Sequence, residues 1–293
     1  MSKVLWLLVL LAAVQRCPAQ NLRSGSTIDV LPKINNTLAK KVRFELYRDS
    51  LIVIHGAIGD LRGLNFLIDT GTDPTVLDKR VADRLHSRLE VVGLETIHRK
   101  VAAWRTIVPN VDLGPVSARD VTVVVQDLSF LEKGLGCRID ALIGLDVLSS
   151  TSFIIDYRAR AITFGDSQVG GPAVTFAHTL PFVKIAMILN GRPVELLLDT
   201  AASSLMLFRT HWPDPPNNER VQHSTNLAGD LPRVPMTLST LALGSLKLRG
   251  QSAFVIDGGQ DVQREFDGLF NPALLGLHQI SFDFENHRFR WSR

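Results

Sequence analysis

Leu64–Leu77 reads LNFLIDTGTDPTVL, and Val194–Leu207 reads VELLLDTAASSLML. In each stretch an apolar run ends in an Asp-Thr-small turn, passes through small or polar residues and becomes apolar again. The same order at two distant places indicates an internal repeat. Residues 58–63 and 189–193 precede the two stretches and are typical of hairpin turns, so each apolar run is predicted to be the second strand of a hairpin.

A second pair of matching segments follows the first pair. Phe153–Phe164 reads FIIDYRARAITF and Ile280–Trp291 reads ISFDFENHRFRW, so each has an Asp-aromatic step between two apolar stretches. Asp156 lies 87 positions after Asp69, and Asp283 lies 84 positions after Asp199. Because two motifs keep nearly the same spacing in both halves, the duplication is interpreted as real. Asp156 and Asp283 are predicted to be turn residues that open a returning strand.

Most of the chain is predicted to form short strands, which places it in the all-β class. Apolar or β-branched runs bounded by turn residues predict strands at Leu51–Ile58, Leu64–Asp69, Val121–Gln126, Val194–Asp199 and Ser252–Ile256. One helix is predicted over Asp78–Leu85, because Leu77, Val81 and Leu85 recur at helical spacing.

Composition indicates a folded protein with no nucleic-acid partner. The chain has 293 residues, of which 45% are hydrophobic and 21% charged, which is ordinary for globular proteins. The formal net charge is +3 and includes Lys3 and Arg16 of a segment expected to be removed, which leaves +1. The Lys and Arg residues are also scattered rather than gathered in a stripe, so no basic face is expected.

The N-terminus is typical of a secretory signal peptide. Lys3 precedes the apolar run Val4–Val14, and Cys17-Pro18-Ala19 supplies small residues before a cut after Ala19. We therefore expect 1–19 to be a signal peptide and the protein to be exported, to the periplasm or the extracellular space. The run is short for a membrane span, although an uncleaved anchor is the alternative. Residues 20–41 are polar and are expected to be loosely ordered.

Removal of Cys17 would leave Cys137 as the single cysteine. The mature monomer is then expected to have no disulfide and no cysteine-rich zinc site. No His-Glu-x-x-His pattern, glycine-rich phosphate loop or Gly-x-Ser-x-Gly segment is present. No metal and no cofactor are therefore expected.

An aspartate at a tight turn after a buried strand is a rigidly placed acid. The threonine supplies a hydroxyl for local hydrogen bonds, and the glycine lets the backbone approach the carboxylate closely. Two such turns facing each other would bring two carboxyls together. Like charges at that distance cannot both ionise, so the pair would share one proton.

LIDTGTDPTVL, residues 67–77, is similar to the active-site segment of retropepsin-like aspartic proteases. Asp140–Leu148, DALIGLDVL, resembles the apolar-apolar-Gly segment of the same family. The resemblance implies a pseudo-dimeric acid-protease fold with one retropepsin-like lobe at 42–168 and another at 169–293. It also implies an aspartic endopeptidase, a hydrolase of peptide or protein substrates, that is a monomer because one chain holds both halves of the site.

The resemblance assigns roles in the first copy. Asp69 would be a catalytic acid, and Thr70 would brace the interface between the lobes. Gly71 would face the substrate chain, and Thr72 would hydrogen-bond the Asp69 carboxylate. Asp73 would bind the substrate backbone.

In the second copy Asp199 and Thr200 would take the same catalytic and bracing roles. Three positions depart from the first copy. Ala201 adds a Cβ where Gly71 stands, and Ala202 removes the hydroxyl of Thr72. Asn271 replaces a glycine of the Asp140 segment, a change expected to be mild because asparagine tolerates left-handed backbone.

Each catalytic turn is expected to be covered by a flap hairpin. The candidates are residues 95–107 in the first copy and 222–235 in the second. Trp104 and His98 are placed where they would contact substrate, while the alternative for Trp104 is to pack the base of the flap.

Two other functions stay open. A peptide-binding or scaffold protein that kept the cleft but lost catalysis is favoured by Ala201 and Ala202, whereas Asp199 favours the enzyme. A β-sandwich adhesin with structural Asp-Thr turns is opposed by the duplicated motif pairs.

Overall fold

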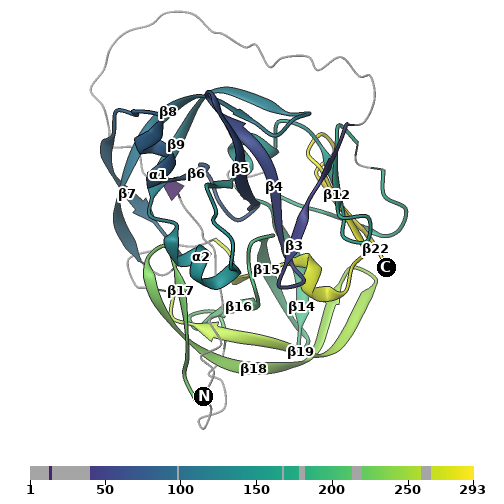
Figure 1. The fold of residues 1–293 in the computed structure, drawn as a ribbon. Helices are drawn as coiled ribbons and strands as arrows, with labels where there is room; N and C mark the ends of the chain where they lie inside the picture. Colours follow the sequence, from purple (N-terminus) through teal and green to yellow (C-terminus); the bar gives the residue numbers. More distant parts are fainter. Residues whose placement is uncertain are drawn as a thin grey trace, which may run out of the picture.

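A computed structural model describes residues 13–14, 40–97, 99–166, 168–177, 182–212, 220–258 and 265–293. These residues form two β-rich lobes joined by a third sheet, which confirms the predicted all-β, two-lobed fold. In Figure 1 the first copy lies above and the second, green, copy below. The predicted signal peptide, apart from 13–14, lies outside the described residues, as do most of the 20–41 segment and His98.

The first lobe is built on a nine-stranded sheet in the order β1-β7-β8-β9-β6-β10-β5-β4-β3. The bounds are β1 Ala13–Val14, β3 Glu45–Tyr47, β4 Leu51–Ile58, β5 Leu61–Ile68, β6 Val76–Asp78, β7 Glu90–Glu95, β8 Lys100–Asp112, β9 Ser117–Gln126 and β10 Ala141–Ile143. β10 runs parallel to β5 and antiparallel to β6, so it lies between the strands on either side of the Asp69 turn.

The second lobe repeats this plan in a seven-stranded sheet ordered β14-β15-β20-β16-β19-β18-β17. Its strands are β14 Lys184–Leu189, β15 Arg192–Leu198, β16 Leu205–Phe208, β17 Gln222–Asn226, β18 Gly229–Leu243, β19 Leu246–Ile256 and β20 Gly268–Phe270. β20 is parallel to β15 and antiparallel to β16, as β10 is to β5 and β6. The repeat in the sequence is therefore a repeat of topology.

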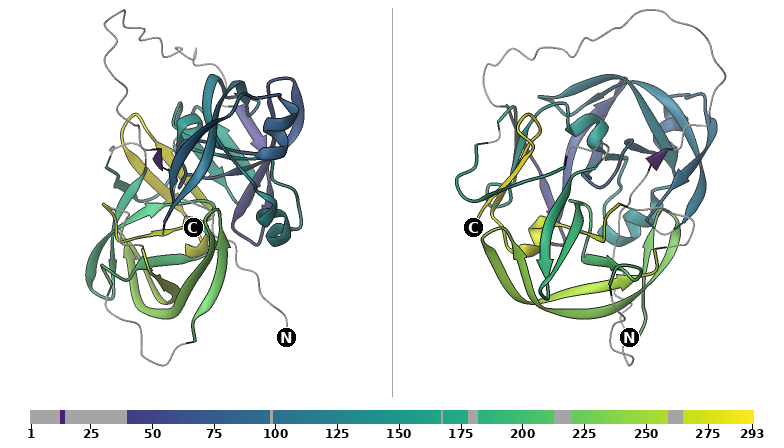
Figure 2. Two further views of the ribbon diagram at one scale, coloured as in Figure 1. Left: turned by 90° about the vertical axis from the view of Figure 1, so that its left-hand side faces the viewer. Right: turned by 180° about the vertical axis from the view of Figure 1, so that it is seen from behind.

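A six-stranded sheet joins the copies in the order β13-β22-β21-β11-β12-β2. It contains β2 Lys40–Arg43, β11 Phe153–Asp156, β12 Ala161–Phe164, β13 Ala173–Thr175, β21 Gln279–Asp283 and β22 Arg288–Ser292. β11 of the first copy pairs with β21 of the second, and the rings of Phe153 and Phe282 are 4.8 Å apart at this seam. Figure 2 shows the yellow strands of the second copy running up beside the first lobe.

The predicted turn roles of Asp156 and Asp283 are confirmed in this sheet. Asp156 Oδ1 accepts from the backbone N–H of Ala159 at 2.7 Å, and Asp283 Oδ1 accepts from that of Asn286 at 3.0 Å. Both carboxylates therefore hold the turn that returns the chain into the next strand.

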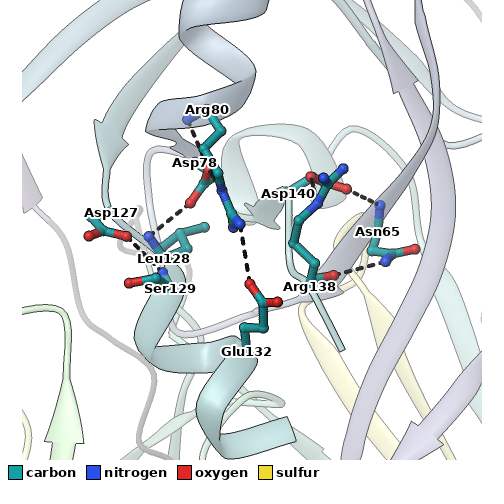
Figure 3. Close-up of polar contacts among 9 residues, drawn as sticks. All are labelled: Asn65, Asp78, Arg80, Asp127, Leu128, Ser129, Glu132, Arg138 and Asp140. Carbon is teal, nitrogen blue, oxygen red and sulfur yellow. Dashed lines mark hydrogen bonds and ion pairs between the residues drawn. The ribbon is translucent and has the colours of Figure 1, made fainter. Parts of the chain in front are cut away.

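Short helices complete the lobes. They are α1 Lys79–Arg84, α2 Ser129–Leu135, α3 Leu145–Leu148 and the 3₁₀ helix η1 Pro272–Leu275. The prediction of a helix over 78–85 is confirmed, since Asp78 is the N-cap of α1 and Leu85 the C-cap. The buried Asp78 carboxylate also accepts from the backbone N–H of Leu128, which ties α1 to the start of α2 (Figure 3).

Candidate active site

Asp69 and Asp199 lie at equivalent places, each one residue after the strand that precedes it, β5 and β15. The backbone N–H of Asp69 donates to the carbonyl of Ile143 at 3.0 Å, and that of Asp199 to the carbonyl of Phe270 at 3.0 Å. Both acids therefore leave their sheet at the end of a parallel strand pair. Because the neighbouring strand holds the backbone, the position of each side chain is set by the sheet.

In each lobe a second aspartate forms hydrogen bonds with the backbone of the strand that precedes the candidate catalytic aspartate. Asp140 accepts from the backbone N–H of Asn65 at 2.9 Å, and its own N–H donates to the carbonyl of Asn65. Arg138 pairs with the Asp140 carboxylate at 2.8 Å, as Figure 3 shows. In the second lobe Asp267 exchanges the same two bonds with Glu195. The bonded residue of each strand, Asn65 or Glu195, lies four residues before the candidate catalytic aspartate, so these bonds restrain the strand that carries it.

The two turns are joined by a reciprocal threonine pair. Thr70 Oγ1 donates to the carbonyl of Leu198 at 2.9 Å, and Thr200 Oγ1 donates to that of Ile68 at 2.7 Å. Each hydroxyl also accepts from the other threonine's backbone N–H at 3.1 Å. Both side chains are buried. The structure thus brings Thr70 and Thr200 together in the predicted bracing position.

The carboxylates face each other across these turns. Gly71 N–H donates to Asp69 Oδ1 at 2.9 Å, and Ala201 N–H donates to Asp199 Oδ1 at 2.8 Å. A Cβ added to Gly71 would lie 2.5 Å from Asp199 Cγ, so no larger residue fits there without a shift. The space beside Gly71 that a Cβ would fill is therefore occupied by the opposite aspartate, and the predicted contact of Gly71 with the substrate chain stays a prediction.

Both aspartates are fully buried, and Oδ2 of each has no hydrogen-bond partner within the described part of the chain. Burial raises the pKa of Asp69 well above its ordinary value, and the negative charge of Asp199 raises it further. Burial also raises the pKa of Asp199, against the lowering effect of the bond from Ala201 N–H. Because two facing carboxyls in a buried site do not both ionise, we expect the pair to hold one proton between two acids.

The alanines of the second turn are accommodated. Ala201 is buried among first-lobe residues such as Leu51 and Val53, and Ala202 is buried among second-lobe residues such as Met206. Ala201 N–H still bonds the carboxylate at the length found at Gly71. The two substitutions therefore leave the turn geometry intact.

The predicted hydrogen bond from Thr72 to the Asp69 carboxylate is wrong in this structure. Thr72 Oγ1 is buried and has no hydrogen-bond partner within the described part of the chain. Its Cγ2 methyl packs against Gly144, 2.9 Å from where a Cβ would stand, and its carbonyl accepts from Leu145 N–H. Packing of the methyl group and the backbone hydrogen bond thus set the orientation of Thr72. The Asp69 carboxylate accepts a hydrogen bond from Gly71 N–H instead.

Asp73, predicted to bind the substrate backbone, is partly buried beside another acid that the sequence reasoning missed. Burial, together with the charge of Asp146, raises the pKa of Asp73 to about 7. Burial likewise raises the pKa of Asp146, whose Oδ1 accepts from Thr75 Oγ1 at 2.7 Å. The signal for Asp146 was its place directly after Gly144-Leu145, the segment that passes behind the catalytic turn.

Asn271 has a different role from the one predicted. Its φ is −97°, so tolerance of left-handed backbone is not the reason it is accepted. Its side-chain amide donates to the carbonyls of Thr200 at 2.8 Å and Ala202 at 3.0 Å. In the first lobe the equivalent carbonyl, that of Thr72, accepts from Leu145 N–H. The second lobe has Pro272 there, which has no N–H, and Asn271 supplies the missing donor.

Both predicted flaps are hairpins. β7 pairs with β8 in the first lobe, and β17 pairs with β18 in the second. Trp104 lies on β8 with 39% of its surface exposed and with Lys79 Nζ 5.8 Å from its ring centre. Both roles considered for Trp104, contact with substrate and packing of the flap base, stay predictions.

Cys137 is a free, half-buried thiol. Among the described residues, no group of three His, Cys, Asp or Glu side chains is arranged to hold a metal ion. The same residues include no helix that is both long enough and apolar enough to cross a membrane.

A family model described as aspartyl protease matches the chain twice, at residues 54–147 and 184–278. The two matches cover more than half of the chain, and each contains one of the facing aspartates. No curated protein matches the chain at a significant level.

Proposed function

The chain belongs to the aspartyl protease family, and we propose that it is an active endopeptidase in which Asp69 and Asp199 hydrolyse peptide bonds. The family membership agrees with the retropepsin-like resemblance of the two Asp motifs. It supports a protease-like function. Our proposal adds that the protein is catalytically active and that these two aspartates carry the activity.

One observation carries the proposal: despite its alanines, the second turn keeps the backbone bond to its aspartate and the threonine bonds that the first turn has. The bonds from residues 71 and 201 to the carboxylates have the same length to within 0.1 Å, and the two threonines exchange equivalent bonds. An inactive scaffold has no need for two buried acids that face each other, because burial of such groups is costly. This supports the enzyme over the peptide-binding scaffold.

In the proposed reaction the pair starts with one proton. The ionised carboxylate takes a proton from a water molecule as its oxygen attacks the carbonyl carbon of the substrate, while the protonated carboxyl donates to the carbonyl oxygen. The resulting diol collapses when the C–N bond breaks: the protonated carboxyl donates its proton to the leaving nitrogen, and the ionised carboxylate takes the proton of one diol hydroxyl, which becomes the new carbonyl. The pair then again holds one proton, so the site is ready for another cycle.

The pairing at the edge of the first flap hairpin favours a substrate that binds in an extended conformation. β1 pairs antiparallel with the outer edge of β7, with Val14 opposite Leu94 and Ala13 opposite Glu95. Backbone groups on this edge therefore accept an added strand, the mode by which many proteins bind peptides. Peptide cleavage by the purified protein, with Asp69→Asn protein as the blank, tests the proposal. Cleavage by both proteins would indicate a contaminating protease, and cleavage by neither would favour the scaffold.

We also propose that the protein is exported after removal of residues 1–19. The support is the Lys3, apolar-run and Ala19 pattern in the sequence. Mass spectrometry of the mature N-terminus tests it: a chain that begins at Gln20 is expected, and a chain that keeps its first residues would overturn the proposal.

A further inference from the structure

The second lobe contains a pocket of about 790 Å³ beside its catalytic turn. Its wall begins with Ser203 and Ser204, four and five residues beyond Asp199. Gln222 and Pro235 from the second flap hairpin and Leu274 and Leu275 of η1 also line it. The pocket therefore lies between the catalytic turn, the flap and the helix that follows Asn271, where a bound peptide would pass under the proposed function.

Arg233 lies behind this wall. Its side chain is fully buried, and its guanidinium carbon is 3.9 Å from the ring centre of Phe254, a residue that also lines the pocket. Nη1 donates to Ser204 Oγ at 3.3 Å, and Nη2 donates to Gln222 Oε1 at 3.5 Å. Burial lowers the pKa of Arg233 to about 10, which still leaves it protonated at neutral pH.

The arginine determines which hydrogen-bonding groups the pocket presents. A guanidinium has donors only, so the oxygens of Ser204 and Gln222 must act as acceptors toward it. The hydroxyl proton of Ser204 and the NH₂ group of Gln222 are then left to donate to another partner. Of the residues that line the pocket in the described part of the chain, none carries a charge, so no carboxylate in the wall competes for these donors.

The equivalent position in the first lobe has the opposite character. Asp73 stands four residues after Asp69, as Ser203 stands four residues after Asp199, and Asp73 is close to Asp146. One lobe therefore offers acidic oxygens where the other offers donors beside a cation. The two catalytic turns are nearly symmetric and do not define a substrate direction, whereas this difference does.

We propose that the Ser204–Gln222 pocket binds a carboxylate of the peptide substrate, so that the enzyme prefers an acidic residue on the side of the second lobe. Ser204 and Gln222 would contact the carboxylate, and Arg233 would be a positioning residue that orients both donors and adds its charge. That the ligand is a peptide rests on the proposed function. That the pocket binds a carboxylate rests on the hydrogen-bond donors of the pocket itself.

Cleavage of matched peptides with Glu or Gln at each position around the scissile bond tests the specificity. We expect kcat/KM to be about tenfold higher for Glu at one position, the typical effect of hydrogen bonds to a charged group. Gln222→Leu, a change at an exposed residue, should reduce the ratio of kcat/KM for the Glu peptide over the Gln peptide to near one. Gln126→Leu, the same change in the first lobe, is the matched control and should keep the preference.

Arg233→Met should have the same effect if the arginine orients the donors, and Arg233→Lys should restore part of the preference by keeping the charge. Since Arg233 is buried and its replacement risks unfolding, Gln222→Leu remains the deciding variant. A Glu preference that survives Gln222→Leu, or no preference in the unmodified protein, would overturn the proposal while leaving peptide cleavage established.

Binding separates this inference from the proposed catalysis. Asp69→Asn protein should bind fluorescent Glu peptides more tightly than Gln peptides in anisotropy titrations, even if the unmodified protein cleaves nothing. Peptides with a free or an amidated C-terminus distinguish a side-chain carboxylate from a terminal one. Equal affinity for all of these peptides would overturn the pocket assignment.

Discussion

Under the proposed function Asp69 and Asp199 share one proton, so each depends on the other for its role. We predict that Asp69→Asn and Asp199→Asn each lower kcat/KM by about 10³-fold, the scale of general acid–base catalysis. Because the two acids act as a unit, the double variant should be no worse than either single one. Rates measured on one good peptide substrate, with circular dichroism to confirm the fold, test this.

Asp60→Asn is the matched control, since Asp60 is exposed in a hairpin turn of the first lobe, and it should leave the rate unchanged. If Asp69→Asn abolishes cleavage but Asp199→Asn does not, the pair within one chain is not the catalytic unit. That result would point to a site completed by Asp69 of a second copy.

The same burial predicts a pH-dependent stability. Since the folded protein raises the pKa of both acids, it keeps a proton that the unfolded chain releases above its ordinary carboxyl pKa. At low pH the pair therefore does not lower the free energy of unfolding. As pH rises toward the folded-state pKa values, the free energy of unfolding falls. Asp69→Asn should remove most of this destabilisation at pH 7, because the variant no longer has two acids in the pair.

Urea unfolding of the unmodified and Asp69→Asn proteins at pH 4 and pH 7 measures this effect. The variant should gain stability relative to the unmodified protein only at the higher pH. Asp127 and Asp156, whose pKa values are lowered, contribute in the opposite direction but cancel in the comparison. An equal difference at both pH values would show that folding does not raise the pKa values of the pair.

Catalysis should also depend on this proton. As pH rises the shared proton is lost, and the acid that donates to the carbonyl oxygen is lost with it. We predict that kcat/KM is highest on the acidic side of neutrality and declines above it. A pH–rate profile that stays flat up to pH 9 would contradict a carboxylate pair.

At the scale of the elements, Asn271 links the end of β20 to the Asp199 turn. Asn271→Ala would leave the buried carbonyls of Thr200 and Ala202 without their side-chain donor. We predict a loss of about 2 kcal/mol in the free energy of unfolding, the usual cost of unsatisfied buried groups. The rate should fall as well, because the turn that holds Asp199 loosens.

Asn271→Gly is the informative second variant, because it recreates the first-lobe residue Gly144 without the Leu145 N–H that accompanies it. It should be as damaging as Asn271→Ala, whereas Asn110→Ala on β8 should change stability by less than about 0.5 kcal/mol. An Asn271→Gly protein with unmodified stability would show that Pro272 needs no compensating donor.

At the scale of the whole molecule, one chain holds both halves of the site. The threonine pair, the β11–β21 seam and the facing aspartates all join the two copies within the chain. We therefore predict a monomer whose activity per chain does not change with concentration. Sedimentation velocity and activity measured over the same concentration range test this, and activity that rises with a dimer fraction would contradict it.

Local patterns were sufficient for much of the fold. The run Leu51–Ile58 was predicted with the bounds that β4 has, and the helix over 78–85 includes α1 with both caps. These elements follow from alternation, turn residues and an N-cap aspartate, all of which act between neighbours in the chain. The pairing of Phe153 with Phe282 could not be predicted from these patterns, because residues far apart in the chain meet there.

Repeated motifs and apolar periodicity were enough to predict a duplicated, two-lobed all-β protein with one Asp-Thr turn in each copy, because both are properties of neighbouring residues in the chain. The folded structure was needed to show that Asp199 fills the space beside Gly71, that Thr72 makes no bond to the carboxylate and that Asn271 replaces a missing N–H donor. Each of these depends on which backbone carbonyl or methyl lies within a few ångströms across the fold. Such distances across the fold cannot be predicted from the spacing of residues along the chain.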